Sequence, residues 1–592
     1  MPERPSCLLV PAAGAGEGMG HLLRCLVLAR ELGGRTSILT ARMDQHARAL
    51  LAEKLRTMPA RTRPALINRM KVAARWDIIV VDARKTTRAE LDLMMAHGLV
   101  VCLDEGGEAA AFAPFLVDSI PSLPGVRKPN RASSAFLSLP RRSRSAIRFP
   151  PRRVLLSFGG EDRQRLSEAM LHALVRKRIF EPRQLTVVEG PLFGARQWPR
   201  EASVMRQPAE LSRALPEFDL LITHFGITAF EALASGVPVL LFNPSRYHAR
   251  LGAASGFHDV GMRVPDLRVL QRLMANPAPL SVQVDAFNRE IGTRRTRGLA
   301  RLLASIGAQG SSSCPICGQA GDPVLDRFPT RTYRRCSSCG TVFLESFTGS
   351  RKRYDVTYFS SAYRAQYGRT YLEDFESIKS ASRERVRIMR EQIAEGLDGM
   401  VIDVGCAYGP FLDALKDAGI PGYGLDVAAD AVAYVRKKLR IPALRSSFET
   451  AARSALPRRI AAVTMWYVLE HFEKTDEVLR KISGLLPRGG VFAFSTPNGR
   501  GISARSDMGS FLQASPADHF TILSPKKLGK LLSRYDLELR RVRVTGHHPD
   551  RFPGLLGKAA KRFAAAHATL LFASRLLGLG DTFEAYAVKG EP

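Results

Sequence analysis

The chain has 592 residues, of which 45% are hydrophobic and 24% charged, and its formal net charge is +31. This length exceeds what one hydrophobic core fills, and the balance of apolar and charged residues excludes an intrinsically disordered chain. Every uncharged apolar run is shorter than the roughly 18 residues of a membrane-spanning helix. Four of the eight cysteines form two CxxC pairs, a usage that fits a reducing compartment. We therefore expect three or four domains and a cytoplasmic protein.

The excess of 87 Lys and Arg over 56 Asp and Glu residues favours anionic partners. Two explanations stay open. One is an arginine-rich composition without a specific partner, and the other is peripheral contact with an anionic membrane surface at the inner membrane face. The sequence argues against nucleic acid as a partner, because no aromatic-rich RNA-binding signature accompanies the basic residues.

The stretch GAGEGMGHLLRCLVLA (14–29) follows an apolar run (7–13) and opens onto a helical pattern. A strand, a glycine loop and a helix start together form a typical site for an anion. The loop is not a dinucleotide fingerprint, because its third glycine position holds Met19 or His21. The second strand (35–42) also lacks the acidic residue that holds an adenosine ribose.

Residues 1–150 and 151–304 each alternate buried strands with amphipathic helices. This alternation predicts parallel, doubly wound sheets, and hence two Rossmann-like domains joined by an arginine-rich segment. The predicted strands are 7–13, 36–41, 76–83 and 99–105 in the first half and 152–160, 185–190, 219–224 and 237–243 in the second.

The stretch THFGITAFEALASGVPVLLFNPS (223–245) carries the polar residues of the second half. Its strand delivers His224 and Gly226 at the carboxyl edge of the sheet, where open α/β sheets bind ligands. The helix that follows directs backbone amides toward a phosphate, and Glu231, one turn further, can accept hydrogen bonds from ribose hydroxyls. The loop SFGG (157–160) allows the close approach of a diphosphate.

These stretches resemble the donor-site signature of GT-B glycosyltransferases over about residues 7–290. The front loop also resembles a branch of that fold that includes the UDP-sugar hydrolases of the pseudaminic acid pathway. The resemblance implies a nucleotide-sugar donor, with a UDP-sugar expected, and His21 as general base. The alternative is that His21 only caps or packs at the helix start. The predicted donor-binding residues are Gly18, Gly20, Gly159, Gly160, His224, Gly226, Thr228 and Glu231.

The middle of the chain holds two cysteine pairs, in CPICG (314–318) and CSSCG (336–340). Each pair with its glycine resembles the turn in which two thiolates meet one tetrahedral zinc ion. The pattern predicts a structural zinc site, with redox dithiols as the alternative. The predicted ligands are Cys314, Cys317, Cys336 and Cys339.

A tyrosine-rich stretch (354–375) follows the cysteines. Two positions are open for it: a substrate lid over the domain that follows, or aromatic packing onto the cysteine knuckle.

The stretch VIDVGCAYGPF (401–411) is an apolar strand that ends in D-x-G-x-x-x-G, and the next strand (422–428) ends with Asp426. Asp426 is placed to hold ribose hydroxyls, and Asp403 can bind an amino group directly or through water. These features, with the strand-end motifs near 466 and 496, resemble class I S-adenosylmethionine-dependent methyltransferases, and 581–589 would be the final antiparallel strand. The predicted cofactor-binding residues are Asp403, Gly405, Gly409, Asp426 and Trp466.

Methyl transfer to a hydroxyl requires a group that removes the proton, and two histidines are candidate catalytic bases. His471 follows the predicted fourth strand, and His519 lies in ADHF. Each can instead be a supporting or capping residue.

The predicted architecture is an α/β fusion of a GT-B nucleotide-sugar enzyme and a zinc-bearing methyltransferase. We expect a bifunctional enzyme of surface-polysaccharide biosynthesis that acts on a glycan or lipid-linked acceptor. The alternatives are a UDP-sugar hydrolase fused to a methyltransferase, or a noncatalytic carbohydrate-binding front module. The predicted domains are 1–150 (GT-B acceptor side), 151–304 (nucleotide-sugar binding), 312–379 (zinc knuckle and tyrosine-rich lid) and 380–592 (class I methyltransferase).

Overall fold

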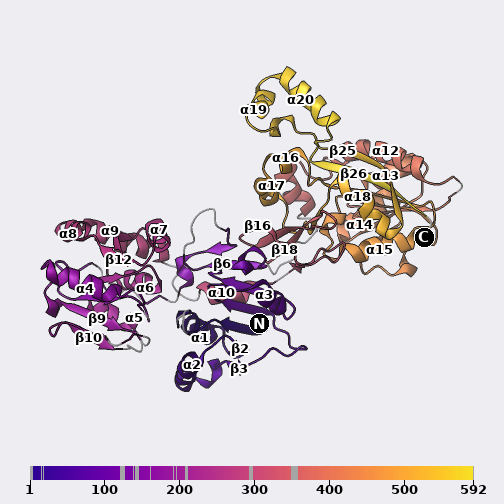
Figure 1. The fold of residues 1–592 in the computed structure, drawn as a ribbon. Helices are drawn as coiled ribbons and strands as arrows, with labels where there is room; N and C mark the ends of the chain where they lie inside the picture. The colour runs from indigo at the N-terminus through magenta and orange to yellow at the C-terminus, as the bar shows by residue number, and fades with distance from the viewer. Residues whose placement is uncertain are drawn as a thin grey trace. The chain divides into compact units, whose positions relative to one another are not determined.

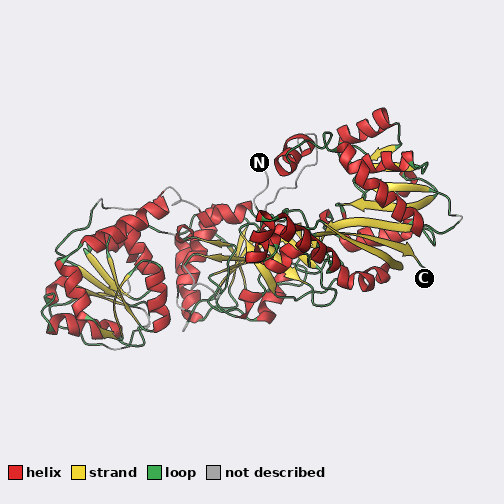
Figure 2. Cartoon of the chain, turned by 90° about the horizontal axis from the view of Figure 1, so that it is seen from above, coloured by secondary structure: helices red, strands yellow, loops and turns green. Residues whose placement is uncertain are grey.

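The computed structural model divides the chain into two compact units, Met1–Ile306 and Gly307–Pro592. Unit 1 contains two mainly parallel sheets and unit 2 contains one, and helices lie on both faces of these sheets (Figures 1 and 2). No helix among the described residues is long and apolar enough to cross a membrane. The structure describes residues 5–14, 17, 19–120, 127–137, 139–140, 144, 146–160, 162–190, 193–194, 196–206, 211–292, 298–307, 309–347, 358–395 and 397–590.

The first sheet of unit 1 is parallel throughout, in the order β3-β2-β1-β4-β5-β6-β7. Its central strands are apolar on both faces because helices cover both sides. The elements are β1 (Cys7–Pro11), α1 (Gly20–Leu32), β2 (Thr36–Leu39), α2 (Gln45–Thr57), β3 (Ala65–Ile67), β4 (Ile78–Asp82), α3 (Arg88–Met95), β5 (Leu99–Leu103), β6 (Phe115–Asp118) and β7 (Arg131–Ala132).

The second sheet of unit 1 repeats this topology, in the order β10-β9-β8-β11-β12-β13-β14, with only β14 antiparallel. Helix α10, at the end of the unit, contacts α1 of the first half. The elements are β8 (Val154–Ser157), α4 (Leu166–Arg176), β9 (Leu185–Glu189), β10 (Ser203–Arg206), α5 (Leu211–Ala214), β11 (Leu220–Thr223), α6 (Ile227–Ser235), β12 (Val239–Asn243), α7 (Arg246–Ala254), β13 (His258–Met262), β14 (Val264–Pro265), α8 (Leu267–Ala275), α9 (Ala278–Ile291) and α10 (Gly298–Ser305).

Unit 2 begins with a small antiparallel sheet that carries the cysteine pairs. Its order is β15-β18-β17-β16, and β18 also pairs with the distant strand β24. Cys314, Ile316, Cys336 and Phe343 belong to the same buried core as the central strands of the methyltransferase sheet. The strands are β15 (Gln309–Gly310), β16 (Val324–Phe328), β17 (Arg331–Arg335), β18 (Val342–Ser346) and β24 (Thr521–Ile522).

The large sheet of unit 2 has the order β21-β20-β19-β22-β23-β26-β25, in which β26 runs antiparallel between β23 and β25. The antiparallel final strand predicted at 581–589 is thereby confirmed. The strands are β19 (Met400–Val404), β20 (Gly422–Asp426), β21 (Ala443–Arg445), β22 (Ile460–Trp466), β23 (Val491–Pro497), β25 (Leu537–Thr545) and β26 (Thr582–Lys589). The helices of unit 2 are α11 (Tyr363–Tyr367), α12 (Phe375–Gln392), α13 (Pro410–Asp417), α14 (Ala429–Tyr434), α15 (Thr475–Leu485), α16 (Ile502–Ser506), α17 (Met508–Ala514), α18 (Pro525–Leu532), α19 (Leu555–Arg562) and α20 (Ala564–Leu576).

Candidate functional site

The glycine loop after β19 requires glycine at both predicted positions. Gly405 and Gly409 have φ angles of 69° and 82°, values that side-chain-bearing residues rarely adopt. A Cβ on Gly405 would lie 2.5 Å from Cγ2 of Val468, and one on Gly409 would lie 2.8 Å from Cδ1 of Leu439. The loop therefore runs so close to its neighbours that only glycine fits.

Asp426 ties this loop to the end of β20. Its carboxylate accepts hydrogen bonds of 2.8 Å from the amides of Ala407 and Ala428. Burial raises the pKa of the carboxyl, and the amide hydrogen bonds oppose that shift. The carboxylate stands at the carboxyl edge of the sheet, the position from which the predicted ribose contact would be made.

Asp403 lies one strand away, near the end of β19, and is almost completely buried. It accepts a hydrogen bond of 2.7 Å from the hydroxyl of Thr464 on β22. Burial raises the pKa of Asp403 to about 7. A cationic amino group bound here would favour the ionised carboxylate.

The aromatic residues after the cysteine pairs pack over the glycine loop. Phe359 and Tyr371 contact Tyr408, with ring centroids 5.1 and 6.0 Å apart, and belong to one cluster with Ala407 and Ala428. Burial raises the pKa of Tyr371, and the nearby Asp403 and Asp426 raise it further. The described part of the stretch (358–375) packs against the methyltransferase loop, and its role as a substrate lid stays a prediction. Residues 354–357 of the stretch lie outside the described residues.

Trp466 ends β22 and packs between two elements. Its ring lies 5.1 Å from that of Phe411 on α13, and the guanidinium of Arg385 lies 4.4 Å from its centroid. The indole nitrogen is buried, and no hydrogen-bond partner for it is found within the described residues. That nitrogen is a hydrogen-bond donor close to Phe411, which follows the glycine loop after β19.

His471 and His519 are brought together with a residue that the sequence reasoning missed, Glu470. One ligand atom from each of the three lies within 4.8 Å of the others, and the two imidazole rings meet edge to face with centroids 4.6 Å apart. Nδ1 of His471 is 3.3 Å from the Asp518 carboxylate. Burial raises the pKa of Glu470 to about 7. Its place directly before His471, at the end of a strand, was the signal available in the sequence.

Backbone hydrogen bonds explain why His519 reaches this position. The amide of Phe520 donates to the carbonyl of Glu470 at 2.7 Å, and the carbonyl of Phe520 accepts from Leu344 on β18 at 3.0 Å. The residue next to His519 thus joins the small antiparallel sheet to the end of β22.

The four predicted cysteines converge. Their sulfur atoms all lie within 4.8 Å of one another, with 3.6 Å between Cys314 and Cys339 and 3.4 Å between Cys317 and Cys336. A tetrahedron with metal–sulfur distances of about 2.3 Å has edges of about 3.8 Å, so the arrangement fits a zinc ion. Gly318 and Gly340, with φ of 71° and 79°, donate back to Cys314 and Cys336 at 2.9 Å and close the two turns.

In unit 1, His21 stands in the first turn of α1 and pairs with a buried carboxylate. Its Nδ1 is 2.6 Å from Oδ1 of Asp82, which ends β4. Asp82 also accepts two hydrogen bonds from Arg24, which in turn contacts Asp104 at 2.5 Å. Burial alone would raise the pKa of Asp82, but Arg24 and His21 hold that pKa below its usual value. A carboxylate on Nδ1 leaves Nε2 of His21 as the proton-accepting atom.

The predicted donor-binding residues of the second sheet lie at its carboxyl edge. His224 follows β11, Gly226 directly precedes α6, and Thr228 lies in the first turn of α6. Burial, His248 and Arg84 lower the pKa of His224 to about 4, and burial raises the pKa of Glu231 to about 7.

The glycines of this site differ in what the structure requires of them. Gly159 has a φ of 83°, and a Cβ there would lie 3.4 Å from Cε1 of His224. Gly160 lies against Gly190: a Cβ added to Gly190 would lie 2.5 Å from the Cα of Gly160. A Cβ on Gly20 would lie 3.8 Å from Ile227 at the start of α6. Gly18 lies outside the described residues.

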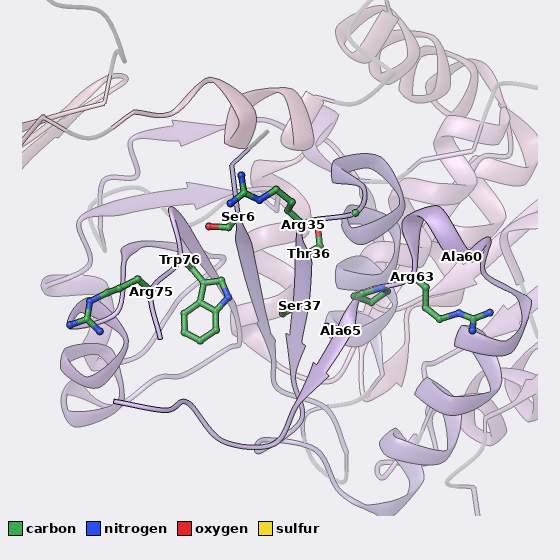
Figure 3. Close-up of a pocket in the computed structure, with 11 residues that line it drawn as sticks. Ser6, Arg35, Thr36, Ser37, Ala60, Arg63, Ala65, Arg75 and Trp76 are labelled. Atoms are coloured by element: carbon green, nitrogen blue, oxygen red, sulfur yellow. The ribbon is translucent and has the colours of Figure 1, made fainter. Parts of the chain in front are cut away.

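A cavity of about 550 Å³ opens at the other end of the first sheet (Figure 3). Ser6 precedes β1, Arg35 precedes β2, Thr36 begins β2, and Trp76 precedes β4, so the cavity lies at the amino ends of the strands. None of the predicted site residues lines it.

Comparison with known proteins concerns mainly unit 2. Residues 379–542 match a family described as "Methyltransferase domain". The chain is 22% identical over 179 residues to the ubiquinone biosynthesis O-methyltransferase of Burkholderia pseudomallei (strain 1710b), covering 28% of this chain and 73% of that protein. It is 24% identical over 209 residues to the protein of the same name from Aliivibrio fischeri (strain MJ11), covering 33% and 88%.

Two solved structures are similar at low overall scores. One is an S-adenosylmethionine-dependent methyltransferase from Archaeoglobus fulgidus, with 16% identity, a TM-score of 0.26, and coverage of 37% of this chain and 99% of that one. The other is described as the glycotransferase of kitacinnamycin, with 16% identity, a TM-score of 0.38, and coverage of 51% and 99%.

The strand order of the large sheet, the glycine loop with its two buried carboxylates and the family match agree with one another. Residues 379–542 are a class I S-adenosylmethionine-dependent methyltransferase domain.

Proposed function

We propose that the methyltransferase domain methylates a hydroxyl of a sugar or glycan, and that unit 1 is a GT-B enzyme acting on a nucleotide-sugar in the same surface-polysaccharide pathway. The proposal for unit 2 rests on one observation: two imidazoles and a carboxylate converge at the strand edge that carries Asp403 and Asp426. S-adenosylmethionine, when bound, supplies an electrophilic methyl group. His519 or His471 would accept the hydroxyl proton as oxygen attacks that methyl group.

The proposal for unit 1 is supported by its repeated topology and by the His21–Asp82 pair. The two sheets have the same strand order. His21 lies beyond the carboxyl edge of the first sheet, and His224 and Glu231 lie beyond that of the second. A base at one edge and a half-buried carboxylate at the other suit a donor sugar and its nucleotide. The nucleophile is either an acceptor hydroxyl or, in the hydrolase alternative, water.

We infer a cytoplasmic enzyme from the cysteine usage, which fits a reducing compartment. The charge of +31 favours anionic partners, so we propose a glycan or lipid-linked acceptor. The cysteine cluster would hold a structural zinc ion.

The first test is incubation of the full-length protein with UDP-, GDP- and dTDP-sugars, with and without membrane extract, followed by measurement of released nucleoside diphosphate. Release that depends on extract supports the transferase and identifies its donor. Equal release without extract supports the hydrolase, and no release from any sugar supports a noncatalytic front module. Transfer of labelled methyl from S-adenosylmethionine into the same extract tests unit 2 in parallel.

A further inference from the structure

Two helices between β25 and β26 leave most of their surface in solvent. Helix α20 has 13 residues, and Ser574 is the one buried among them. Helix α19 buries only Gly557 and Ala560. In Figure 1 these helices, in yellow, stand apart from the sheet that they interrupt. We call residues 551–580 the helical hairpin.

Large apolar side chains concentrate on this hairpin. Of the 18 large hydrophobic residues that are exposed among the described residues, six lie in it. Covering such side chains with an apolar phase lowers the free energy by roughly 25 cal/mol per Å² of buried apolar surface. Clustered exposure of this kind marks a surface that binds something. The six are Leu555 (82% exposed), Leu556 (54%), Phe563 (56%), Phe572 (70%), Leu576 (75%) and Leu577 (64%).

The charge of the hairpin has one sign. Residues 551–580 contain five basic residues and neither Asp nor Glu. Arg551 bonds to Asp581 at the base. The other four, Lys558, Lys561, Arg562 and Arg575, are exposed on the same helices as the apolar side chains. Apolar and basic side chains interleaved on short helices match the boundary between acyl chains and anionic headgroups.

The hairpin emerges at the catalytic edge of the methyltransferase sheet. Because β26 runs antiparallel to β23, its first residue Thr582 pairs with Pro497 at the carboxyl end of β23. The base is fixed there: Asn498 donates to the Gly580 carbonyl at 2.8 Å, and Nδ1 of His547 is 2.8 Å from the Ser574 hydroxyl. Anything that binds the hairpin is held beside the edge that carries His471 and His519.

We propose that the helical hairpin is a docking surface for an anionic lipid bilayer, in whose interface α19 and α20 lie. The docked protein presents its methyltransferase edge to an acceptor held at the membrane. The inference goes beyond the proposed function, because lipid binding requires neither a particular methyl acceptor nor turnover by unit 1.

The test is sedimentation of the full-length protein with vesicles of phosphatidylcholine alone or mixed with phosphatidylglycerol. We expect binding to the mixed vesicles that weakens as salt is added. The double variants Phe572→Ser/Leu576→Ser and Lys558→Glu/Lys561→Glu should each weaken it by about tenfold or more. These positions are exposed, so melting temperatures should stay those of the wild type.

Two control variants match these changes away from the hairpin. Val72→Ser alters a 90% exposed apolar residue in unit 1, and Lys437→Glu/Lys438→Glu reverses two exposed charges in unit 2. Both should bind vesicles as the wild type does. Equal binding by the hairpin variants and the controls would overturn the proposal. So would wild-type protein that ignores vesicles but self-associates in light scattering through Phe572 and Leu576, because a second copy would then cover this face.

Discussion

The hydroxyl of Thr464 donates a 2.7 Å hydrogen bond to Asp403, a carboxyl group whose pKa burial raises to about 7. In the cofactor-free protein Asp403 is therefore largely protonated below pH 7. The amino group of S-adenosylmethionine would require the ionised form. Affinity for the cofactor should rise about tenfold between pH 6 and pH 8 and then level off.

Isothermal titration at both pH values measures this, with Asp403→Asn and the exposed Asp398→Asn as the pair of variants. Asp398→Asn should behave as the wild type, and Asp403→Asn should bind weakly at both pH values. Because the pKa of Asp403 is raised in the folded state, its ionisation removes stability as pH rises from about 4 to 7. Asp403→Asn should therefore melt higher than the wild type at pH 8 and not at pH 4. A wild-type affinity independent of pH would contradict the assignment.

The protein should contain one zinc ion per chain, held by the four cysteines. Cys317→Ser should lose that ion, while Ser338→Ala, an exposed change in the second turn, should keep it. Elemental analysis measures the content. Because Cys314 and Cys336 belong to the buried core of the methyltransferase sheet, zinc loss should also lower the melting temperature of unit 2 and its methylation rate. A zinc-free protein whose cysteines form disulfides under mild oxidation would support the redox alternative.

Replacement of His519 by Asn should lower the methylation kcat by about a hundredfold or more, with affinity for S-adenosylmethionine unchanged. His172→Asn, at an exposed position on α4, serves as control. If chelation abolishes methylation in the zinc-loaded protein and Mg²⁺ restores it, Glu470, His471 and His519 act as metal ligands. That result would contradict the role of His519 as base.

His21→Asn should abolish nucleoside diphosphate release, and Asp82→Asn should reduce it by about a hundredfold, because the asparagine no longer orients and supports the imidazole. Methylation should be unaffected in both. Asp82→Asn also leaves Arg24 with a weakened buried partner, so unit 1 should melt lower in that variant alone. Asp92→Asn, half-exposed on α3, is the control. Donor turnover at the wild-type rate in His21→Asn would contradict the role of His21 as the general base.

Local pattern was enough to predict most strands and the parallel sheets. The runs 76–83 and 99–105 each hold four or five consecutive apolar residues (78–81 and 99–103) because helices cover both faces of the sheet, and the structure has β4 and β5 within them. Interactions between distant residues were not predictable. His21 and Asp82 are 61 residues apart, and neither residue carries a local sign of the other.

The helical hairpin was missed for a different reason. Residues 555–577 are apolar enough to suggest a segment of the hydrophobic core, but almost none of the residues of α19 and α20 are buried. Apolar composition in this segment therefore does not indicate burial within the domain. Glu470 was missed because a single carboxylate after a strand is common. Only the fold shows that His519 lies beside it.

The pairing of β18 with β24 determines where this protein can be divided. A gene fragment that encodes residues 379–592 alone would lack the strand that holds Phe520, and His519 would lose its fixed position against Glu470. The smallest part that can be transferred as a working unit is thus 307–592. Domain shuffling that keeps methylation must include the small antiparallel sheet with its cysteines as well as the large sheet. In directed evolution, crossover points between 347 and 379 should yield inactive chimaeras, and those near 306 should yield active ones.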